Sequence, residues 1–315
     1  MLAKGDVVGP SGDIAKFVNL EVPQVLIMNW LRAVTVAAAM VSCGPCLAAQ
    51  ILTTTKADTP PTIDGMASDP AWSGATAVVT QARIAKIDVT IKSVYTSDRI
   101  YFIVTFPDEN ENRDHKTLRW VPEQERYNTG YNREDTFVFK WSMEPMPVDL
   151  SVAADNAYDA DIWFWKAHRT DPAGYADDKM HRLSAAETRQ ASIIYSKNGL
   201  PYYLSRPSDN GTAAYRVQNY EKFVHDRMPK YRVGQPSGSR SDVRAKGMWR
   251  NGRWTIEFGR NLNTTHSDDV QFDPRQRYQF GISRYEIAGR RRNTKLDQPY
   301  YGAGDTGESL TLEFK

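Results

Sequence analysis

Cysteine is almost absent from this 315-residue sequence, which contains only Cys43 and Cys46. The two residues form a C-x-x-C motif, which serves redox chemistry where a strand leads into the N-terminus of a helix. Here an Ala/Val-rich run precedes the motif, so we reject the redox interpretation. The rest of the chain therefore has no disulfide, no cysteine-ligated metal and no site for thioether attachment of a cofactor.

An excess of charge of either sign is also missing. Lys and Arg together number 40, Asp and Glu number 38, and the formal net charge is +2. The one dense basic run, 290–292, is typical of a solvated loop. This composition lacks the basic surface of a nucleic-acid-binding protein, and we expect no nucleic-acid partner.

Apolar runs long enough to cross a membrane are lacking as well. The run Ala33–Val41 is much shorter than the roughly 20 residues of a spanning helix. It lies within Met28–Ala49, which has Arg32 in a short n-region and small residues before a cleavage position near Ala48 or Ala49, the pattern of a secretory signal peptide. We therefore predict a leader over residues 1–49, a single domain over residues 50–315, a periplasmic location and no integral membrane span after cleavage.

Runs of β-branched and aromatic residues dominate the predicted mature chain, and such runs favour strands. We expect strands at 77–85, 87–94, 100–106, 136–141, 278–285 and 309–314. The segment 247–258 predicts a β-hairpin, because Asn251 and Gly252 can supply the positive φ angles of a type I′ turn. Many short strands separated by turn residues predict an all-β fold, an antiparallel β-sandwich.

Three segments do not have this strand pattern. Residues 184–190 predict a short helix, whereas residues 108–133 and 206–242 predict long loops. Loops of this length in a compact domain are usually functional or mobile.

The stretch DIWFWK (161–166) places unusual aromatic surface beside fixed charges. Trp163 and Trp165 are two residues apart, so on a strand they face the same way and form one wall of a core or of a pocket. Lys166, His168 and Arg169 follow at once. The combination predicts a pocket for a flat apolar ligand.

Four segments together resemble a known family: IDGMASDPAW (63–72), SVYTSDRIYFIVTFPD (93–108), DIWFWKAHRTDPAGYADD (161–178) and WRNGRWTIEFGRNL (249–262). They are similar to the ethylbenzene dehydrogenase-type haem-binding domain, the family that includes the γ subunits of periplasmic molybdenum enzymes related to dimethyl sulfoxide reductase. The first segment is shared with other sandwiches, including family 9 carbohydrate-binding modules. The resemblance covers essentially all of residues 50–315 and implies a β-sandwich that holds a non-covalent b-type haem and transfers electrons.

The resemblance gives the aromatic stretch a role in holding the macrocycle. Trp163 and Trp165 would line it, while Lys166 and Arg169 would pair with its propionates, for which a guanidinium offers a bidentate fork. His168 would lie at the same edge. The alternative interpretation of the two tryptophans is ordinary core packing.

Axial ligands are implied by the resemblance alone. In the γ subunits that resemble this chain, a methionine and a lysine ligate the haem iron, which makes Met143, Met146 and Lys295 the candidates here. A lysine binds iron only as the neutral amine, so burial must lower its pKa. His168 is the alternative ligand, since other relatives use histidine. Core packing of the methionines and a solvated Lys295 are the plain structural alternatives.

A carbohydrate-binding module without haem is the alternative function. Tryptophan faces stack on sugars while amide and guanidinium groups bind hydroxyls. Trp163, Trp165, Asn156 and Arg169 would then be the binding residues.

Calcium is a third possibility, since carboxylates recur in two short runs. Neither run has the spacing of a calcium-binding loop, so we interpret them as solvated turn carboxylates: Asp171, Asp177 and Asp178 in the first, Asp268 and Asp269 in the second.

Independent catalysis is not expected, because no nucleophile elbow, phosphate-binding loop or zinc-protease motif occurs. The acid pairs Glu134–Asp135 and Asp177–Asp178 are adjacent in sequence, so on a strand their side chains face opposite ways. We therefore expect a non-enzymatic electron-transfer protein or subunit. Its redox partner would be the molybdenum and iron–sulfur subunits of a periplasmic oxidoreductase, or a c-type cytochrome.

Overall fold

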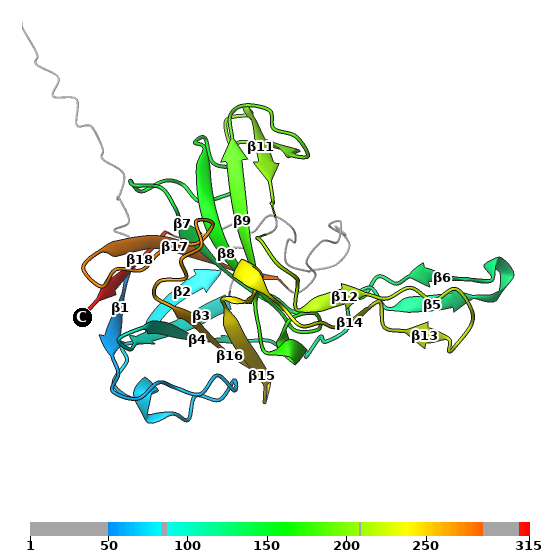
Figure 1. Ribbon diagram of the computed structural model, residues 1–315, viewed down its shortest axis with the longest axis horizontal. Helices are drawn as coiled ribbons and strands as arrows, with labels where there is room; N and C mark the ends of the chain where they lie inside the picture. Colours follow the sequence, from blue (N-terminus) through cyan, green and yellow to red (C-terminus); the bar gives the residue numbers. More distant parts are fainter. Residues whose placement is uncertain (1–49, 83–86, 208, 286–308) are drawn as a thin grey trace, which may run out of the picture. The chain divides into compact units, whose positions relative to one another are not determined.

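The computed structural model describes residues 50–82, 87–207, 209–285 and 309–315 (Figure 1). Contacts divide the chain between residues 46 and 47, and all the described residues belong to the unit Leu47–Lys315. Their strands are β1 (Gln50–Lys56), β2 (Val78–Ala82), β3 (Ile87–Tyr95), β4 (Arg99–Pro107), β5 (Leu118–Val121), β6 (Arg126–Thr129), β7 (Thr136–Ser142), β8 (Tyr158–Lys166), β9 (Asp177–Ser184), β10 (Ser192–Tyr195), β11 (Pro201–Ser205), β12 (Tyr215–Val217), β13 (Arg227–Met228), β14 (Tyr231–Val233), β15 (Arg244–Trp249), β16 (Arg253–Asn261), β17 (Arg277–Tyr285) and β18 (Leu310–Phe314).

Two sheets joined through β1 form the sandwich. One has the order β10-β11-β9-β8-β7-β17-β18-β1, and the other has β1-β3-β4-β16-β15 with β2 also paired to β3. The first part of β1 pairs with β18 and its last two residues, Thr55 and Lys56, pair with β3, both in parallel. The remaining pairings within the two sheets are antiparallel, which confirms the expected antiparallel β-sandwich.

Aromatic side chains from both sheets meet in the core between them. The Phe102 ring of β4 lies 5.1 Å from that of Phe139, 5.3 Å from that of Trp141 and 5.7 Å from that of Trp163, measured between centroids. All four side chains are fully buried. Burying such a side chain contributes about 1.5–3 kcal/mol to stability, so the aromatic alternation in β7 and β8 is a principal source of the fold.

The predicted strands and hairpin correspond to β2, β3, β4, β7, β15, β16, β17 and β18. The hairpin turn has φ 52° at Asn251 and φ 72° at Gly252. Positive φ at both central residues is the requirement of a type I′ turn, and the turn prediction is confirmed.

The prediction of a helix over residues 184–190 is wrong. Residues 185–190 form bends and a turn, and the Ser184 hydroxyl accepts a hydrogen bond from the backbone N–H of Ala186. Such a local side-chain acceptor stabilises a turn in competition with a helix.

The two long loops expected over 108–133 and 206–242 contain short strands. β5 and β6 form a hairpin that also pairs with β13, and β12 pairs with β14. These strands are only two to four residues long, which explains why their pattern was not detected.

The segment 63–72, which we call the opening motif, is anchored by a single buried carboxylate. Glu257 of β16 accepts hydrogen bonds from the backbone N–H groups of Asp64 and Gly65, at 3.0 and 2.9 Å, and from Trp72 Nε1 at 2.8 Å. Trp72 is almost fully buried.

No described helix has both the length and the apolar character needed to cross a membrane.

Candidate functional site

The motif 161–178 has two faces, because β8 and β9 are adjacent antiparallel strands. Asp161, Trp163 and Trp165 alternate on the face that packs into the sandwich core. Ile162 and Phe164 lie on the opposite face, where a second apolar cluster covers the sheet. The motif is therefore covered on both sides.

Trp163 and Trp165 are both 0% exposed. Trp163 contacts the rings of Phe102 and Trp141, and Trp165 packs edge-on against Trp254 with 4.9 Å between centroids. The core-packing alternative thus describes their surroundings. Direct contact of the two indoles with a ligand stays a prediction.

Asp171 fixes the turn that follows β8. Its Oδ1 accepts hydrogen bonds from Trp165 Nε1 at 2.9 Å and from the Gly247 backbone N–H at 2.6 Å. Its Oδ2 lies 2.7 Å from Arg113 Nη1. Asp171 is buried, so the interpretation as a solvated turn carboxylate is wrong for this residue.

Positive charge gathers around Asp177. Lys166 Nζ donates to its Oδ2, Lys179 Nζ lies 3.2 Å from the same oxygen, and Arg240 Nη2 donates to Oδ1 at 2.6 Å. Three cations around one carboxylate leave an excess of two positive charges. We call these four residues the cationic cluster; Asp177 is buried in it and not solvated.

The pKa values of the cluster follow from this geometry. Burial would raise the pKa of Asp177, but Lys166 and Lys179 outweigh it and hold that pKa below its usual value. Burial lowers the pKa of Lys166 to about 8 against the opposing effect of Asp177. Lys166 therefore stays mostly protonated at neutral pH, and it loses its proton more readily than an ordinary lysine.

Aromatic rings border the cationic cluster. Lys166 Nζ lies 4.5 Å from the Phe164 centroid and 5.2 Å from that of Tyr215. The Arg169 guanidinium lies 5.4 Å from the Tyr215 centroid and 5.5 Å from that of Tyr231. Aromatic faces and cations are thus combined on the outer face of β8, away from the sandwich core.

Arg169 and His168 are both tied to the segment before β7. Arg169 pairs through Nε with the buried carboxylate of Glu134, which also accepts the backbone N–H of His168 at 2.7 Å. His168 Nδ1 is 2.7 Å from the Arg113 carbonyl oxygen. Asp135 instead binds Trp254 Nε1, so the adjacent acids face opposite ways, as predicted.

The candidate ligands differ in their surroundings. Met143 directly follows β7 and is half-buried against the core, whereas Met146 is 71% exposed. Lys295 lies outside the described residues. His181, on β9, has a pKa held well below its ordinary value by burial and nearby cations, so its imidazole is neutral.

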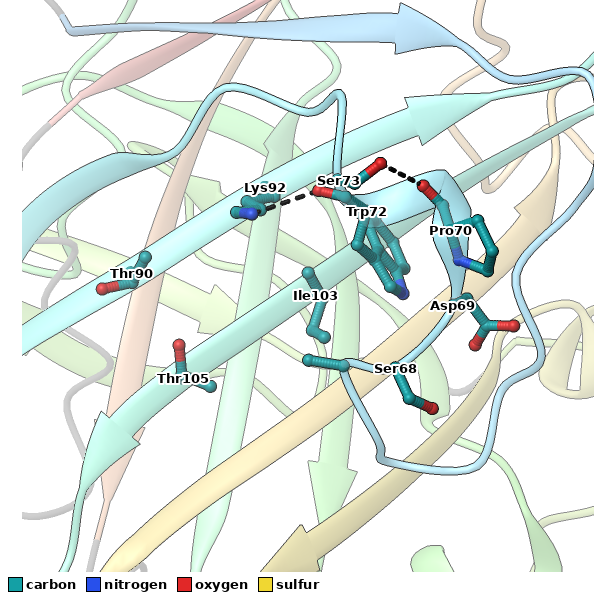
Figure 2. Close-up of a pocket in the computed structure, with 10 residues that line it drawn as sticks. Ser68, Asp69, Pro70, Trp72, Ser73, Thr90, Lys92, Ile103 and Thr105 are labelled. Carbon is teal, nitrogen blue, oxygen red and sulfur yellow. Dashed lines mark hydrogen bonds between the residues drawn. The ribbon is translucent and has the colours of Figure 1, made fainter.

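Two of the cavities that adjoin the sandwich are lined by described residues. One of about 300 Å³ is lined by Met143, Asp269, Arg277 and Tyr278 among others. The other, of about 280 Å³, lies against β3 and β4 below the opening motif (Figure 2). There Lys92 Nζ donates to the Trp72 carbonyl oxygen at 3.1 Å. Only the first contains a predicted site residue, Met143.

The family model for ethylbenzene dehydrogenase matches residues 66–295. The chain belongs to the ethylbenzene dehydrogenase family. This confirms the resemblance drawn from the four segments, all of which lie within or overlap the matched range. No curated protein matches the chain significantly.

Two solved structures similar to this family member are described in terms of carbohydrate binding. A protein from Bacteroides uniformis described in those terms has 11% identity and a TM-score of 0.36, covering 85% of this chain and 100% of its own. A family 9 carbohydrate-binding module from Caldicellulosiruptor kristjanssonii, in complex with cellotriose, has 10% identity and a TM-score of 0.36, covering 84% and 94%. Similarities this weak carry no argument about ligands.

The proposed sugar-binding set does not form a platform in this ethylbenzene dehydrogenase family member. Trp163 and Trp165 present no face to solvent, and Arg169 pairs with Glu134. Stacking on a sugar requires an accessible ring face. As folded, these residues do not offer one.

Three residues of the candidate site were missed by sequence analysis. Lys179 follows Asp177 by two residues, so on a strand the two side chains share a face, and the sequence could have indicated this contact. Arg240 comes from the 206–242 segment and Tyr215 from β12, and neither carries a local motif. Arg240 is 63 residues from Asp177 in sequence, so only the fold brings them together.

Proposed function

We propose that this protein binds a b-type haem non-covalently and transfers electrons in the periplasm, as a non-catalytic subunit or partner of an oxidoreductase. The family match over residues 66–295 carries the proposal, because the family is associated with haem-binding subunits of oxidoreductases. The predicted signal peptide supports the location. The redox partner would be molybdenum and iron–sulfur subunits or a c-type cytochrome.

The cationic cluster fits the acidic edge of a haem. A haem carries two propionates, and Lys166, Lys179 and Arg240 leave two positive charges uncompensated around Asp177. The side chains of Lys179 and Arg240 keep 21% and 13% of their surface exposed, so both can reach an added carboxylate. Arg169 and His168 would extend this edge.

The macrocycle needs apolar and aromatic surface. Phe164, beside Lys166 on the outer face, and Tyr215 supply such surface next to the propionate-binding charges. In this arrangement Trp163 and Trp165 would support β8 from the core side and hold its outer face in position.

Of the two candidate methionines, Met143 is half-buried and shielded from water, whereas Met146 is exposed. Met143 packs on the core side at the far end of β7 from Lys166, so iron ligation by Met143 and propionate binding at the cationic cluster are alternative placements of the haem. Lys295 is proposed as the second ligand. His168 stays the alternative ligand implied by the resemblance. The neutral imidazole of His181 is a further candidate, because only an unprotonated nitrogen can bind a metal. A haem held in this way supplies one-electron transfer, and its potential depends on ligand identity and burial.

The test is the reduced-minus-oxidised absorption spectrum of the full chain, exported to a periplasm, purified and quantified by a pyridine haemochrome assay. We expect a b-type spectrum with about one haem per chain. Colourless protein that stays colourless on titration with haem would contradict the proposal. Thermal stabilisation of that colourless protein by glycans would favour the carbohydrate-binding alternative.

A further inference from the structure

A second group of carboxylates lies inside the sandwich, away from the cationic cluster. Asp161 on β8, Asp178 on β9 and Asp269 in the connection between β16 and β17 are all buried, at 0%, 0% and 4% exposure. One oxygen of each lies within 4.8 Å of one oxygen of every other. We call these three residues the buried acidic cluster.

The cluster has more negative charge than its partners neutralise. Arg260 of β16 donates to Asp161 Oδ2 at 2.6 Å, and its Nη1 is 4.0 Å from Asp269 Oδ2. The guanidinium is itself fully buried against the rings of Trp163 and Phe272. Three carboxylates and one guanidinium leave two negative charges, and burying uncompensated charge costs several kcal/mol per ion.

Most of the carboxylate oxygens in the cluster have no hydrogen-bond donor. Both oxygens of Asp178, both of Asp269 and Oδ1 of Asp161 are buried without a partner among the described residues. Buried polar atoms in native proteins are almost always satisfied. Since one oxygen of each carboxylate lies within 4.8 Å of the others, these unpaired atoms indicate a place for a cation that takes oxygen ligands.

We propose that the buried acidic cluster of Asp161, Asp178 and Asp269 binds a calcium ion. Ca²⁺ prefers oxygen ligands at about 2.3–2.6 Å, so any two of its ligand atoms lie no more than about 5 Å apart. The three carboxylate oxygens, within 4.8 Å of one another, meet this limit. Its charge cancels the two excess negative charges. The cluster offers no sulfur or nitrogen ligand, which disfavours zinc and copper. The site does not depend on the proposed haem.

The experiment uses the full exported chain and two probes, Ca²⁺ and Tb³⁺. Tb³⁺ occupies oxygen-ligand calcium sites and emits when a nearby indole is excited, and Trp163 is the cross-strand partner of Asp178. We expect about one Ca²⁺ per chain by metal analysis. We also expect the Tm to be about 5 °C or more higher in Ca²⁺ than in a chelator, when the free Ca²⁺ concentration is about a hundred times its Kd for the protein.

Variants locate the ion. Asp178→Asn should abolish both the Tb³⁺ emission and the Ca²⁺-dependent rise in Tm. The control Asp159→Asn makes the same substitution on the neighbouring strand β8, in a surface pair with Arg182, and should keep both. Emission that survives Asp178→Asn and disappears in His266→Gln would assign the ion to the Asp242–His266–Asp269 group and overturn the proposal. Wild-type protein that contains no Ca²⁺, and whose Tm does not respond to it, would also overturn it, because the carboxylates would then share protons instead.

Discussion

Gly247 lies directly against the indole of Trp165: a β-carbon at position 247 would be 2.4 Å from Cζ2 of that ring. The backbone N–H of Gly247 and Nε1 of Trp165 donate to the same oxygen of Asp171. The hairpin β15–β16 is thereby fixed to the turn after β8. This contact connects the core side of the candidate site to the opposite sheet.

Gly247→Ala should destabilise the protein by about 1–3 kcal/mol, the usual cost of overpacking a buried site. Trp165 is fully buried and has no room to move away. The measurement is the free energy of unfolding in urea. Gly74→Ala is the control, because a β-carbon at Gly74 would meet no atom within 4 Å. Equal stability of the two variants would contradict the packing described for Trp165.

Lys179→Gln and Arg240→Gln should each weaken haem binding about ten-fold, which corresponds to about 1.4 kcal/mol. Each removes one of the two excess positive charges beside Asp177. Haem titration of the apoprotein measures the Kd. Lys197→Gln is the control, since this exposed lysine pairs with Asp149 elsewhere on the surface. Unchanged affinity in both variants would show that the propionates bind at a different place.

Met143→Leu should alter the Soret band of the haem-loaded protein, whereas Met146→Leu should leave it unchanged. Leucine conserves apolar volume but cannot ligate iron, and only Met143 is shielded by the core. Absorption spectra of the two variants in both redox states provide the measurement. A Soret shift in Met146→Leu alone would reverse the assignment.

Stability should fall by about 1 kcal/mol or more between pH 6.5 and pH 8 in protein kept free of divalent cations. Burial raises the pKa of both Asp135 and Glu257 to about 7. The folded protein therefore binds these protons more tightly than the unfolded chain, and the stabilisation is lost as the pH rises through the folded pKa.

Histidines set the lower limit of this pH window. Burial lowers the pKa of His115 to about 2 and also lowers that of His181, so both histidines destabilise the fold as the pH falls through their ordinary pKa of 6.5, and they oppose the effect of the two acids at the lower end of the window. Urea unfolding at the two pH values measures the effect. Glu257→Gln, which cannot titrate, should show a smaller change than the wild type. A stability that rises with pH across this window would contradict the burial of the two acids.

A large part of the fold was predictable because it is encoded locally. Alternating aromatic residues predict β7, and Asn251–Gly252 predicts the turn of the β15–β16 hairpin. The same alternation correctly places Asp177 and Asp178 on opposite faces. Ser184 was misread, because its hydroxyl stabilises a turn.

The candidate site was only partly predictable, because its members are brought together from distant segments. Arg169 meets Glu134 across 35 residues of sequence, and Arg240 meets Asp177 across 63. Nothing in the local pattern of the 206–242 segment indicates that Arg240 joins this site. Likewise, Asp269 carries no signal that it lies near Asp161.

The sequence by itself determined the strands β2, β3, β4, β7 and β15 to β18, the hairpin turn, the family and the shared orientation of Trp163 and Trp165. Only the tertiary structure decided that these indoles face the core, while Phe164 and Lys166 form the outer face. The physical reason is that strand periodicity specifies which residues share a face, whereas burial depends on what packs against that face. In this protein both faces of β8 are covered, so contacts with strands distant in sequence determine which of its residues face the sandwich core.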